Sequence, residues 1–145
     1  MATRTARTAW SGTVSEGTGE VELVSSGLAT FHVSFPERAA DDAGAVTSPE
    51  ELIAAALSSC YCMQLSALIA EAGGTPRALD VRADVSFGPD PAGGFHIPGI
   101  RLVVRGDPEG LDAARFAEVA EDAKSTCPVS KALTGVAITV EASLG

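Results

Sequence analysis

The sequence predicts an α+β fold in which an antiparallel sheet packs on one long helix. Three observations lead to this prediction. Segments that alternate between apolar and polar residues lie on both sides of a long apolar segment, residues 52–72. Helix-capping residues precede that segment and two glycines follow it. The chain has no internal repeat, and its 145 residues are typical of one domain, so we expect a single domain over residues 1–145.

The first third of the chain predicts strands followed by a loop. Residues Trp10–Val14 and Glu20–Phe35 alternate in the way strands do, and Ser25-Ser26-Gly27 supplies a turn within the second segment. Residues Pro36–Val46 are polar and have no periodicity. A loop of this length is more often functional than a plain connector.

The long helix has a clear predicted start and end. Ser48 fits the N-cap, Pro49 the first helical position and Glu51 the third, which together make a capping box. The helix should run to about Ala72 and stop at Gly73-Gly74.

This helix is long enough to cross a membrane, but its composition favours another interpretation. It is rich in Ala and Ser, contains Gln64 and Glu71, and has no flanking Lys or Arg. We expect a core helix, covered by other elements or by a second subunit, and no membrane partner.

The rest of the chain predicts strands, two helices and a last strand. The long amphipathic helix has Asp112 in its first turn, where an acidic side chain is favourable. The predicted strands are Leu79–Phe87, Ile97–Arg105 and Val136–Ala142, with a turn at Pro89–Gly94, a helix at Leu111–Lys124 and a short helix from Cys127-Pro128 through Leu133.

Charge and cysteine content exclude several classes of function. The formal net charge is −9 and no basic run is present, so nucleic acid is not an expected partner. No signal peptide is visible, which predicts a cytoplasmic protein. Three cysteines are too few for a disulfide scaffold, and in the cytoplasm a disulfide is more often catalytic than structural.

Cys127 is the cysteine with the strongest local signal. Pro128 fits the first position of a helix, which puts Cys127 at or next to its N-cap. Free backbone N–H groups there lower a thiol pKa, and Lys131 adds positive charge one turn later. A buried small residue before a helix is the alternative interpretation, and the fragment alone leaves both open.

Cys60 and Cys62 lie in the middle of the apolar helix. Burial there raises a thiol pKa, so Cys60 needs a cationic neighbour to be reactive, and by itself it is typical of core packing. Cys62 is about 200° further round the helix and faces elsewhere. Neither the cysteine spacing nor His32 and His96 makes a metal site, and we expect no metal.

Three charged residues near the start of the long helix could act with a cysteine. Arg38 lies in the predicted loop, in F-P-E-R, and a solvated surface arginine is the simplest interpretation. Glu51 is occupied by the capping box, whereas Glu50 is free to point elsewhere. Both could simply be favourable acids in a first helical turn.

Taken together, these segments resemble the OsmC/Ohr family (osmotically inducible and organic hydroperoxide resistance proteins). The resemblance rests on T-S-P-E-E-L-I-A-A-A-L-S-S-C, residues 47–60, on C-P-V-S-K-A-L, residues 127–133, and on F-P-E-R, which ends at Arg38. It follows the order of elements over nearly the whole chain. Two features depart from the family: Leu57 stands where many relatives have His, and Cys62 is an extra thiol.

The resemblance implies an OsmC-like fold, with antiparallel sheets wrapped around long central helices in an intertwined homodimer. It also implies active sites at the subunit interface and the reduction of organic hydroperoxides, with hydrogen peroxide as a further substrate to test. Cys60 would be the peroxidatic cysteine and Cys127 the resolving one. Arg38 would activate Cys60, and Glu50 would hold Arg38. The cycle needs a dithiol reductant, lipoyl-type in the Ohr branch, and no cofactor.

Two other functions stay open from the sequence. The same cysteine pair could serve a redox-sensing or stress-binding protein that oxidises once and does not turn over. A structural dimer with inert buried thiols is the third possibility.

The local sequence and the family resemblance favour different cysteines as the reactive thiol. Helix capping favours Cys127 as the more acidic thiol, whereas the resemblance assigns the attack on the peroxide to Cys60. The two views agree only if folding brings Arg38 to Cys60.

Overall fold

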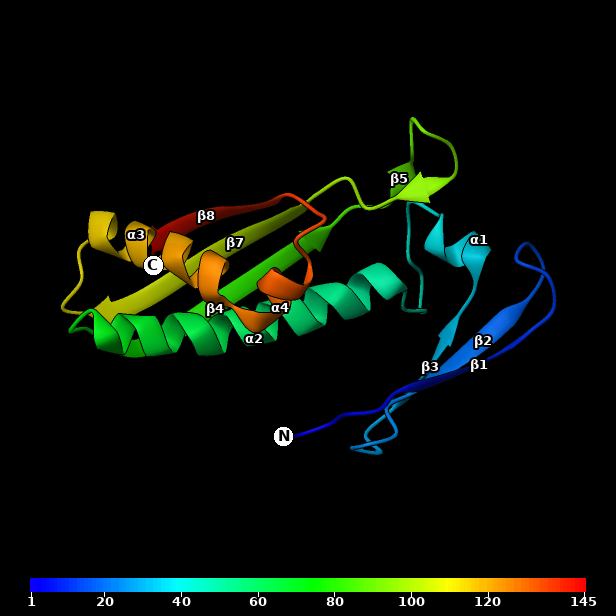
Figure 1. Ribbon diagram of the computed structural model, residues 1–145, viewed down its shortest axis with the longest axis horizontal. Coiled ribbons are helices and arrows are strands. Elements are labelled where there is room, and N and C mark those ends of the chain that lie inside the picture. Colours follow the sequence, from blue (N-terminus) through cyan, green and yellow to red (C-terminus); the bar gives the residue numbers. More distant parts are fainter. The chain divides into compact units, whose positions relative to one another are not determined.

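The computed structural model describes every residue of the chain, 1–145. It contains two compact units, residues 1–52 and 53–145, whose elements are labelled in Figure 1. The predicted α+β class is confirmed, since small sheets and helices occur together. The prediction of a single domain stays a prediction.

Unit 1 is built on a three-stranded antiparallel sheet in the order β1-β2-β3. The strands are β1 (Arg7–Ser11), β2 (Thr18–Glu22) and β3 (Thr30–Val33). The predicted strand at Trp10–Val14 is therefore placed too late. The chain leaves β1 at Gly12, whose φ of +94° few other residues adopt, so a turn begins there.

A short helix, α1 (Phe35–Arg38), occupies the start of the segment predicted as a loop. Ser34 is its N-cap: the Ser34 hydroxyl accepts from the Glu37 N–H at 3.4 Å and donates to the Glu37 carboxylate at 2.5 Å. The motif S-x-x-E with proline early in the helix is a recognised start signal, which the sequence analysis overlooked here. Arg38 is the last residue of this helix.

The long helix is confirmed as α2 (Pro49–Glu71). The Ser48 hydroxyl accepts from the Glu51 N–H at 3.2 Å, as a capping residue should. The Glu51 carboxylate instead accepts from the Thr47 hydroxyl at 2.6 Å. Glu51 therefore makes a local contact at the start of the helix, as predicted, but its carboxylate binds the Thr47 hydroxyl and not Ser48 of the predicted capping box.

Unit 2 contains a sheet in the order β4-β7-β8, formed by β4 (Thr75–Val85), β7 (Ile100–Glu109) and β8 (Ile138–Leu144). β4 and β7 are antiparallel, but β7 and β8 are parallel, unlike the all-antiparallel sheet we expected. Parallel neighbours need a crossover, and the two helices between β7 and β8 supply it. The predicted turn at Pro89–Gly94 is present, and it connects the two strands of a small hairpin, β5 (Gly88–Pro89) and β6 (Phe95–His96).

The crossover consists of α3 (Ala113–Thr126) and α4 (Pro128–Ala132). The helix α3 begins two residues later than predicted, so Asp112 is its N-cap and not a residue of its first turn; the Asp112 carboxylate accepts from the Arg115 N–H at 2.8 Å. Cys127 joins the two helices: it ends α3 and begins α4. The prediction that Cys127 stands at a helix start is confirmed.

The apolar core lies entirely within unit 2. Along β7 every second residue from Ile100 to Pro108 is buried, as expected for a strand with one covered face. The Tyr61 hydroxyl on α2 donates to the Ala120 carbonyl on α3 at 2.6 Å and so joins the two helices. The buried hydrophobic residues are Leu57, Tyr61, Leu65, Ile69, Ile100, Leu102, Val104, Phe116, Val119, Ala120, Ala123 and Cys127.

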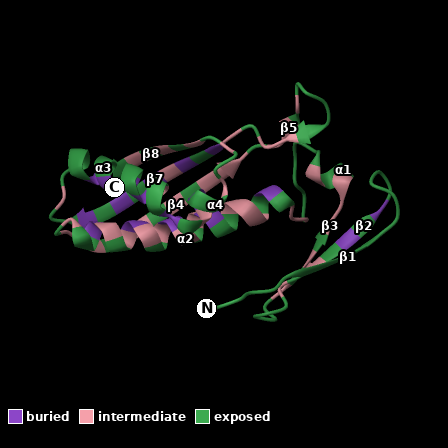
Figure 2. Ribbon diagram, viewed as in Figure 1, coloured by how far each residue is buried: buried purple, intermediate pink, exposed green.

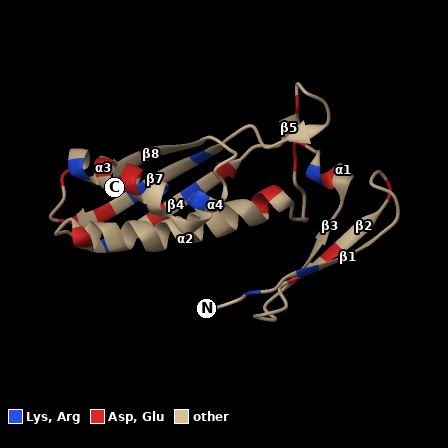
Figure 3. Cartoon of the chain, viewed as in Figure 1, with Lys and Arg blue, Asp and Glu red and all other residues tan.

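One side of α2 remains open to solvent in the single chain. Figure 2 shows exposed positions recurring along the helix, and Met63 keeps 74% of its surface exposed. Figure 3 shows that acidic residues stand only at the ends of α2. By length and composition α2 could cross a membrane, but core helices of soluble proteins often pass the same test.

Candidate active site

The first group of candidate residues is an ion pair between Arg38 and Glu50 within unit 1. The Arg38 guanidinium donates to both carboxylate oxygens of Glu50, with Nη2–Oε1 at 2.6 Å and Nε–Oε2 at 3.1 Å. The Glu50 side chain is 8% exposed and that of Arg38 is 31% exposed. Such two-point contacts fix the plane of the guanidinium, so Arg38 is held in one orientation.

Two adjacent helix ends bring this pair together. Arg38 closes α1, and Glu50 lies in the first turn of α2. Of the two acidic residues at the start of α2, Glu50 is the one that binds Arg38. Glu51 is exposed and bonded to Thr47, while Glu50 is buried and bonded to Arg38.

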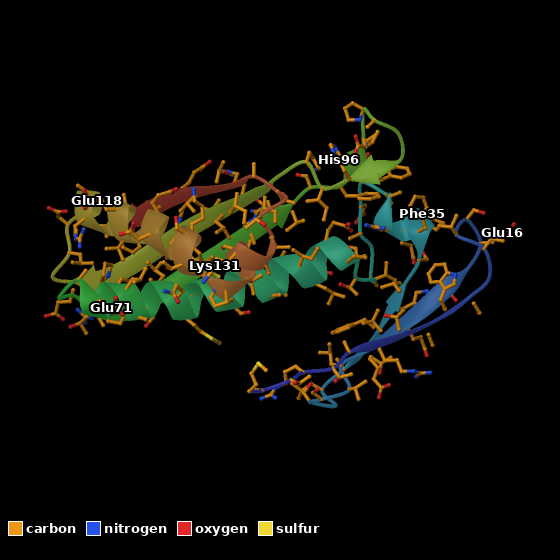
Figure 4. All side chains as sticks on the ribbon, in the orientation of Figure 1. Glu16, Phe35, Glu71, His96, Glu118 and Lys131 are labelled. Carbon is orange, nitrogen blue, oxygen red and sulfur yellow. The ribbon has the colours of Figure 1, made fainter.

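An apolar cavity of about 390 Å³ adjoins Arg38 in unit 1. Phe35, labelled on α1 in Figure 4, is one of its walls. A cavity of this size accepts a small organic molecule, with Arg38 as the charged group at its wall. No pattern in the sequence predicts this cavity, whose other lining residues are Thr8, Trp10, Val14, Val21, Val33, Ser34, Pro49 and Leu52.

The second group is a pair of cysteines in unit 2. Cys60 of α2 and Cys127 at the α3–α4 junction are 67 residues apart, yet the two thiols lie close enough for each to shift the pKa of the other. Both are free thiols; Cys127 is fully buried and Cys60 is half-buried. A polar contact close by joins the same elements, since the Gln64 amide donates to the Thr126 hydroxyl at 3.0 Å.

The surroundings of Cys127 make it the more acidic thiol of the pair. Burial alone raises the pKa of the Cys127 thiol. The Ser130 N–H, the Cys60 thiol, the Ser130 hydroxyl and the Val129 N–H oppose that effect, and the pKa of Cys127 is lowered overall. Lys131, labelled in Figure 4, is not among the groups that cause the shift.

Cys60 is shifted in the opposite direction. Burial raises the pKa of its thiol, the Val129 N–H opposes this more weakly, and the neighbouring Cys127 adds to the increase. Within unit 2, therefore, Cys60 has no cation to favour its thiolate. This agrees with the expectation from the sequence that Cys60 needs a cationic neighbour to react near neutral pH.

Cys62 takes no part in this arrangement. Burial raises the pKa of its thiol, with Asp80 as the second cause, and Cys127 is not among its neighbours. No group of three His, Cys, Asp or Glu side chains in the chain could hold a metal ion. Leu57, where relatives were expected to have His, is fully buried in the core.

Comparisons of the sequence with known proteins agree on one protein family. The family model described as OsmC-like protein matches residues 41–142. Peroxiredoxin OsmC of Escherichia coli is 40% identical over 124 residues, which cover 86% of this chain and 85% of that protein.

Several solved structures have a fold similar to that of this chain. The organic hydroperoxide resistance protein OhrB of Bacillus subtilis has a TM-score of 0.73 and 29% identity, over 97% of this chain and 98% of its own. An organic hydroperoxide resistance protein from Elizabethkingia anophelis has a TM-score of 0.76 and 25% identity, over 99% and 98%. A protein from Legionella pneumophila at 23% identity shares the fold with a TM-score of 0.76, over 100% and 98%.

Proposed function

We propose that this chain, which belongs to the OsmC family, reduces organic hydroperoxides through a cycle of Cys60 and Cys127. Its relatives include a peroxiredoxin and organic hydroperoxide resistance proteins, and the chain is a peroxidase. The observation that carries the cysteine cycle is the proximity of a half-buried and a fully buried thiol from distant parts of the sequence, each of which shifts the pKa of the other.

The first step is the oxidation of Cys60. Its thiolate attacks the terminal oxygen of the hydroperoxide, the O–O bond breaks, and the alkoxide leaves and takes up a proton to become an alcohol. Cys60 becomes a sulfenic acid. We assign attack to Cys60 because its sulfur is the accessible one, whereas Cys127 has no exposed surface.

The second step forms a disulfide. The Cys127 sulfur attacks the sulfenic sulfur of Cys60, and the hydroxyl leaves as water. The contact between the two thiols supports this step, because the acceptor and the attacking atom are already neighbours. Formation of the disulfide protects Cys60 from further oxidation, and an external dithiol of the lipoyl type restores both thiols.

Arg38 is proposed to activate Cys60 and polarise the peroxide. Burial disfavours the Cys60 thiolate, and a guanidinium close to a thiolate stabilises the charged form. The ion pair with Glu50 holds the Arg38 fork rigid, so that it can meet the charge that develops on the leaving alkoxide. The adjoining apolar cavity suits the organic part of the substrate.

We propose that the working form is a homodimer with its sites at the subunit interface. The resemblance to the OsmC/Ohr family implies a dimer. In the single chain, unit 1 buries no hydrophobic side chain and α2 exposes one face. A sheet needs an apolar partner to be stable, and a second subunit would supply it. Light scattering at micromolar concentration should give twice the chain mass of 14.7 kDa, whereas a monomer would contradict this proposal.

The fold is that of a family of soluble proteins, and we place the protein in the cytoplasm, where a dithiol pool can reduce the disulfide. We also propose that residues 1–145 work as one domain in the dimer. The family model spans the boundary between the two units, which supports this.

Turnover of an organic hydroperoxide tests the peroxidase cycle. Consumption of cumene hydroperoxide is followed with excess dihydrolipoamide, with hydrogen peroxide in a parallel series. Cys60→Ser should abolish turnover, and Cys62→Ser is the matched control in the same helix. One equivalent consumed without turnover would instead indicate a redox sensor. Unchanged turnover by Cys60→Ser would exclude the cycle altogether.

A further inference from the structure

Both lysines of the chain border one cavity in unit 2. Lys124 lies in the last turn of α3 and Lys131 lies in α4, where Figure 4 labels it, and the sequence contains no other lysine. The cavity has a volume of about 230 Å³ and lies where the two helices meet the start of β8. Neither Cys60 nor Cys127 lines it, so it is distinct from the candidate active site.

The two lysines differ in their ion pairs. Lys124 is paired with Glu121 one turn earlier in α3, and only 26% of the Lys124 side chain is exposed. Lys131 forms no ion pair in the chain. The cavity therefore has one uncompensated positive charge beside a neutral pair. A ligand with a single negative charge matches this balance, whereas a dianion is disfavoured further by the net charge of −9.

A buried serine hydroxyl in the wall of the cavity has no partner. Ser130 is 7% exposed and lines the cavity, and its hydroxyl forms no hydrogen bond in the chain, to the Cys127 sulfur or to any other atom. Buried hydroxyls are normally hydrogen-bonded, because an unpaired one has lost its hydration without compensation. An acceptor oxygen of a ligand bound in the cavity would supply the missing partner.

The remaining wall of the cavity includes an apolar part. Leu133, Val136 and Ile138 line it, so a ligand with a hydrocarbon tail would bury that tail against them. A cavity of about 150 Å³ binds benzene, which has six carbon atoms. In proportion, the cavity of about 230 Å³ holds about nine heavy atoms. A carboxylate with a chain of about six carbons has this size.

We propose that this cavity is a binding site for a short-chain aliphatic carboxylate, a role that goes beyond the proposed peroxidase. The carboxylate binds the ammonium groups of Lys124 and Lys131 and accepts from the Ser130 hydroxyl, while the tail packs on the apolar wall. Favourable charge at helix ends is the alternative explanation for the lysines, since both lie in last turns. That explanation accounts for neither the unpaired hydroxyl nor the apolar wall.

Titration of the isotope-labelled protein with hexanoate tests the site by nuclear magnetic resonance, without peroxide or reductant. The amide resonances of Thr134 and its neighbours should shift saturably, with a Kd on the order of 1 mM, as expected for a ligand of so few atoms. 1-Hexanol lacks the carboxylate and acetate lacks the tail, so each should bind at least about tenfold more weakly. Absence of saturable shifts with hexanoate would overturn the proposal. Tighter binding of inorganic phosphate than of hexanoate would overturn the ligand class.

Charge variants with a matched control locate the binding. Lys124→Gln and Lys131→Gln should each weaken hexanoate binding about tenfold, because a hydrogen bond between charged groups is lost. The control is Arg115→Gln, which removes a cation of α3 that is likewise paired with an acid three residues away but lies outside the cavity. Its Kd should equal that of the parent. Equal weakening in all three variants would indicate a general attraction of anions to surface cations and would overturn the site.

Ser130→Ala separates ligand binding from packing. Removal of an unpaired buried hydroxyl should not lower the melting temperature of the free protein. Hexanoate should raise the melting temperature of the wild type, and the variant should bind hexanoate about fivefold more weakly because one hydrogen bond is lost. A lower melting temperature without hexanoate, together with an unchanged Kd, would show a structural serine and overturn its assignment to the site.

Discussion

Unit 1 and unit 2 hold their candidate catalytic groups in different ways. In unit 1, Arg38 and Glu50 are 12 residues apart and are joined by an ion pair between two helix ends. In unit 2, Cys60 and Cys127 meet because α2 and the crossover helices share one apolar core. The charge pair therefore depends on local chain geometry, whereas the thiol pair depends on the packing of segments that are far apart in the sequence.

The largest expected effect is on stability and concerns the core of unit 2. Leu65→Ala removes a fully buried side chain and should lower the free energy of unfolding by about 2–5 kcal/mol. Leu28→Ala in unit 1, where 83% of the side chain is exposed, should change it by less than about 0.5 kcal/mol. Urea unfolding of both variants checks this. Equal losses would show that unit 1 has its own core in the native protein.

The next effect is on activity and concerns the charge pair. Arg38→Ala should slow Cys60 oxidation about a hundredfold, or about 2.7 kcal/mol, because the guanidinium no longer stabilises thiolate and alkoxide. Arg38→Lys should recover only part, since an ammonium cannot present a planar fork. Stopped-flow oxidation by cumene hydroperoxide measures both variants, with exposed Arg7→Ala as control. A wild-type rate in Arg38→Ala would make Cys127 the leading candidate for the reactive thiolate.

The same variant makes a prediction about pH. Burial raises the pKa of Cys60 above its ordinary value, so without Arg38 little thiolate exists at neutral pH. The oxidation rate of Arg38→Ala should therefore keep rising as the pH increases through and beyond the ordinary thiol pKa. The wild-type rate should level off at lower pH. Superimposable pH profiles would mean that Arg38 does not influence the ionisation of Cys60.

A smaller loss is expected when only the support of Arg38 is changed. Glu50→Gln keeps the shape of the side chain but removes the charge that orients the guanidinium, so oxidation should slow about tenfold, or about 1.4 kcal/mol. Glu51→Gln is the neighbouring control and should react at nearly the wild-type rate, since Glu51 bonds Thr47. Equal losses in the two variants would indicate a general effect of acidic charge at the start of α2.

The smallest effect concerns the contact between α2 and α3. Tyr61→Phe removes the hydroxyl that donates to the Ala120 carbonyl and should lower the free energy of unfolding by about 1 kcal/mol. Because Tyr61 is next to Cys60 in sequence, the rate of disulfide formation should be measured as well. A loss of disulfide formation with unchanged stability would show that this hydrogen bond aligns the thiols.

Features that depend on neighbours within a few residues were predictable from the amino-acid sequence. Ser48 and Pro49 start α2, and Pro128 places Cys127 at a helix start, because capping involves only the adjacent turn. The same local reasoning would have found α1 from Ser34 and Glu37. The motifs around Cys60 and Cys127 also indicated the family, which the family model confirms.

Contacts between groups that are distant in the sequence depend on the tertiary fold. It formed the buried ion pair between Arg38 and Glu50, and it made β8 parallel to β7. It also brought Cys60 close to Cys127. Local patterns do not encode these contacts, because each one results from the packing of many side chains whose positions are fixed only when the whole core forms.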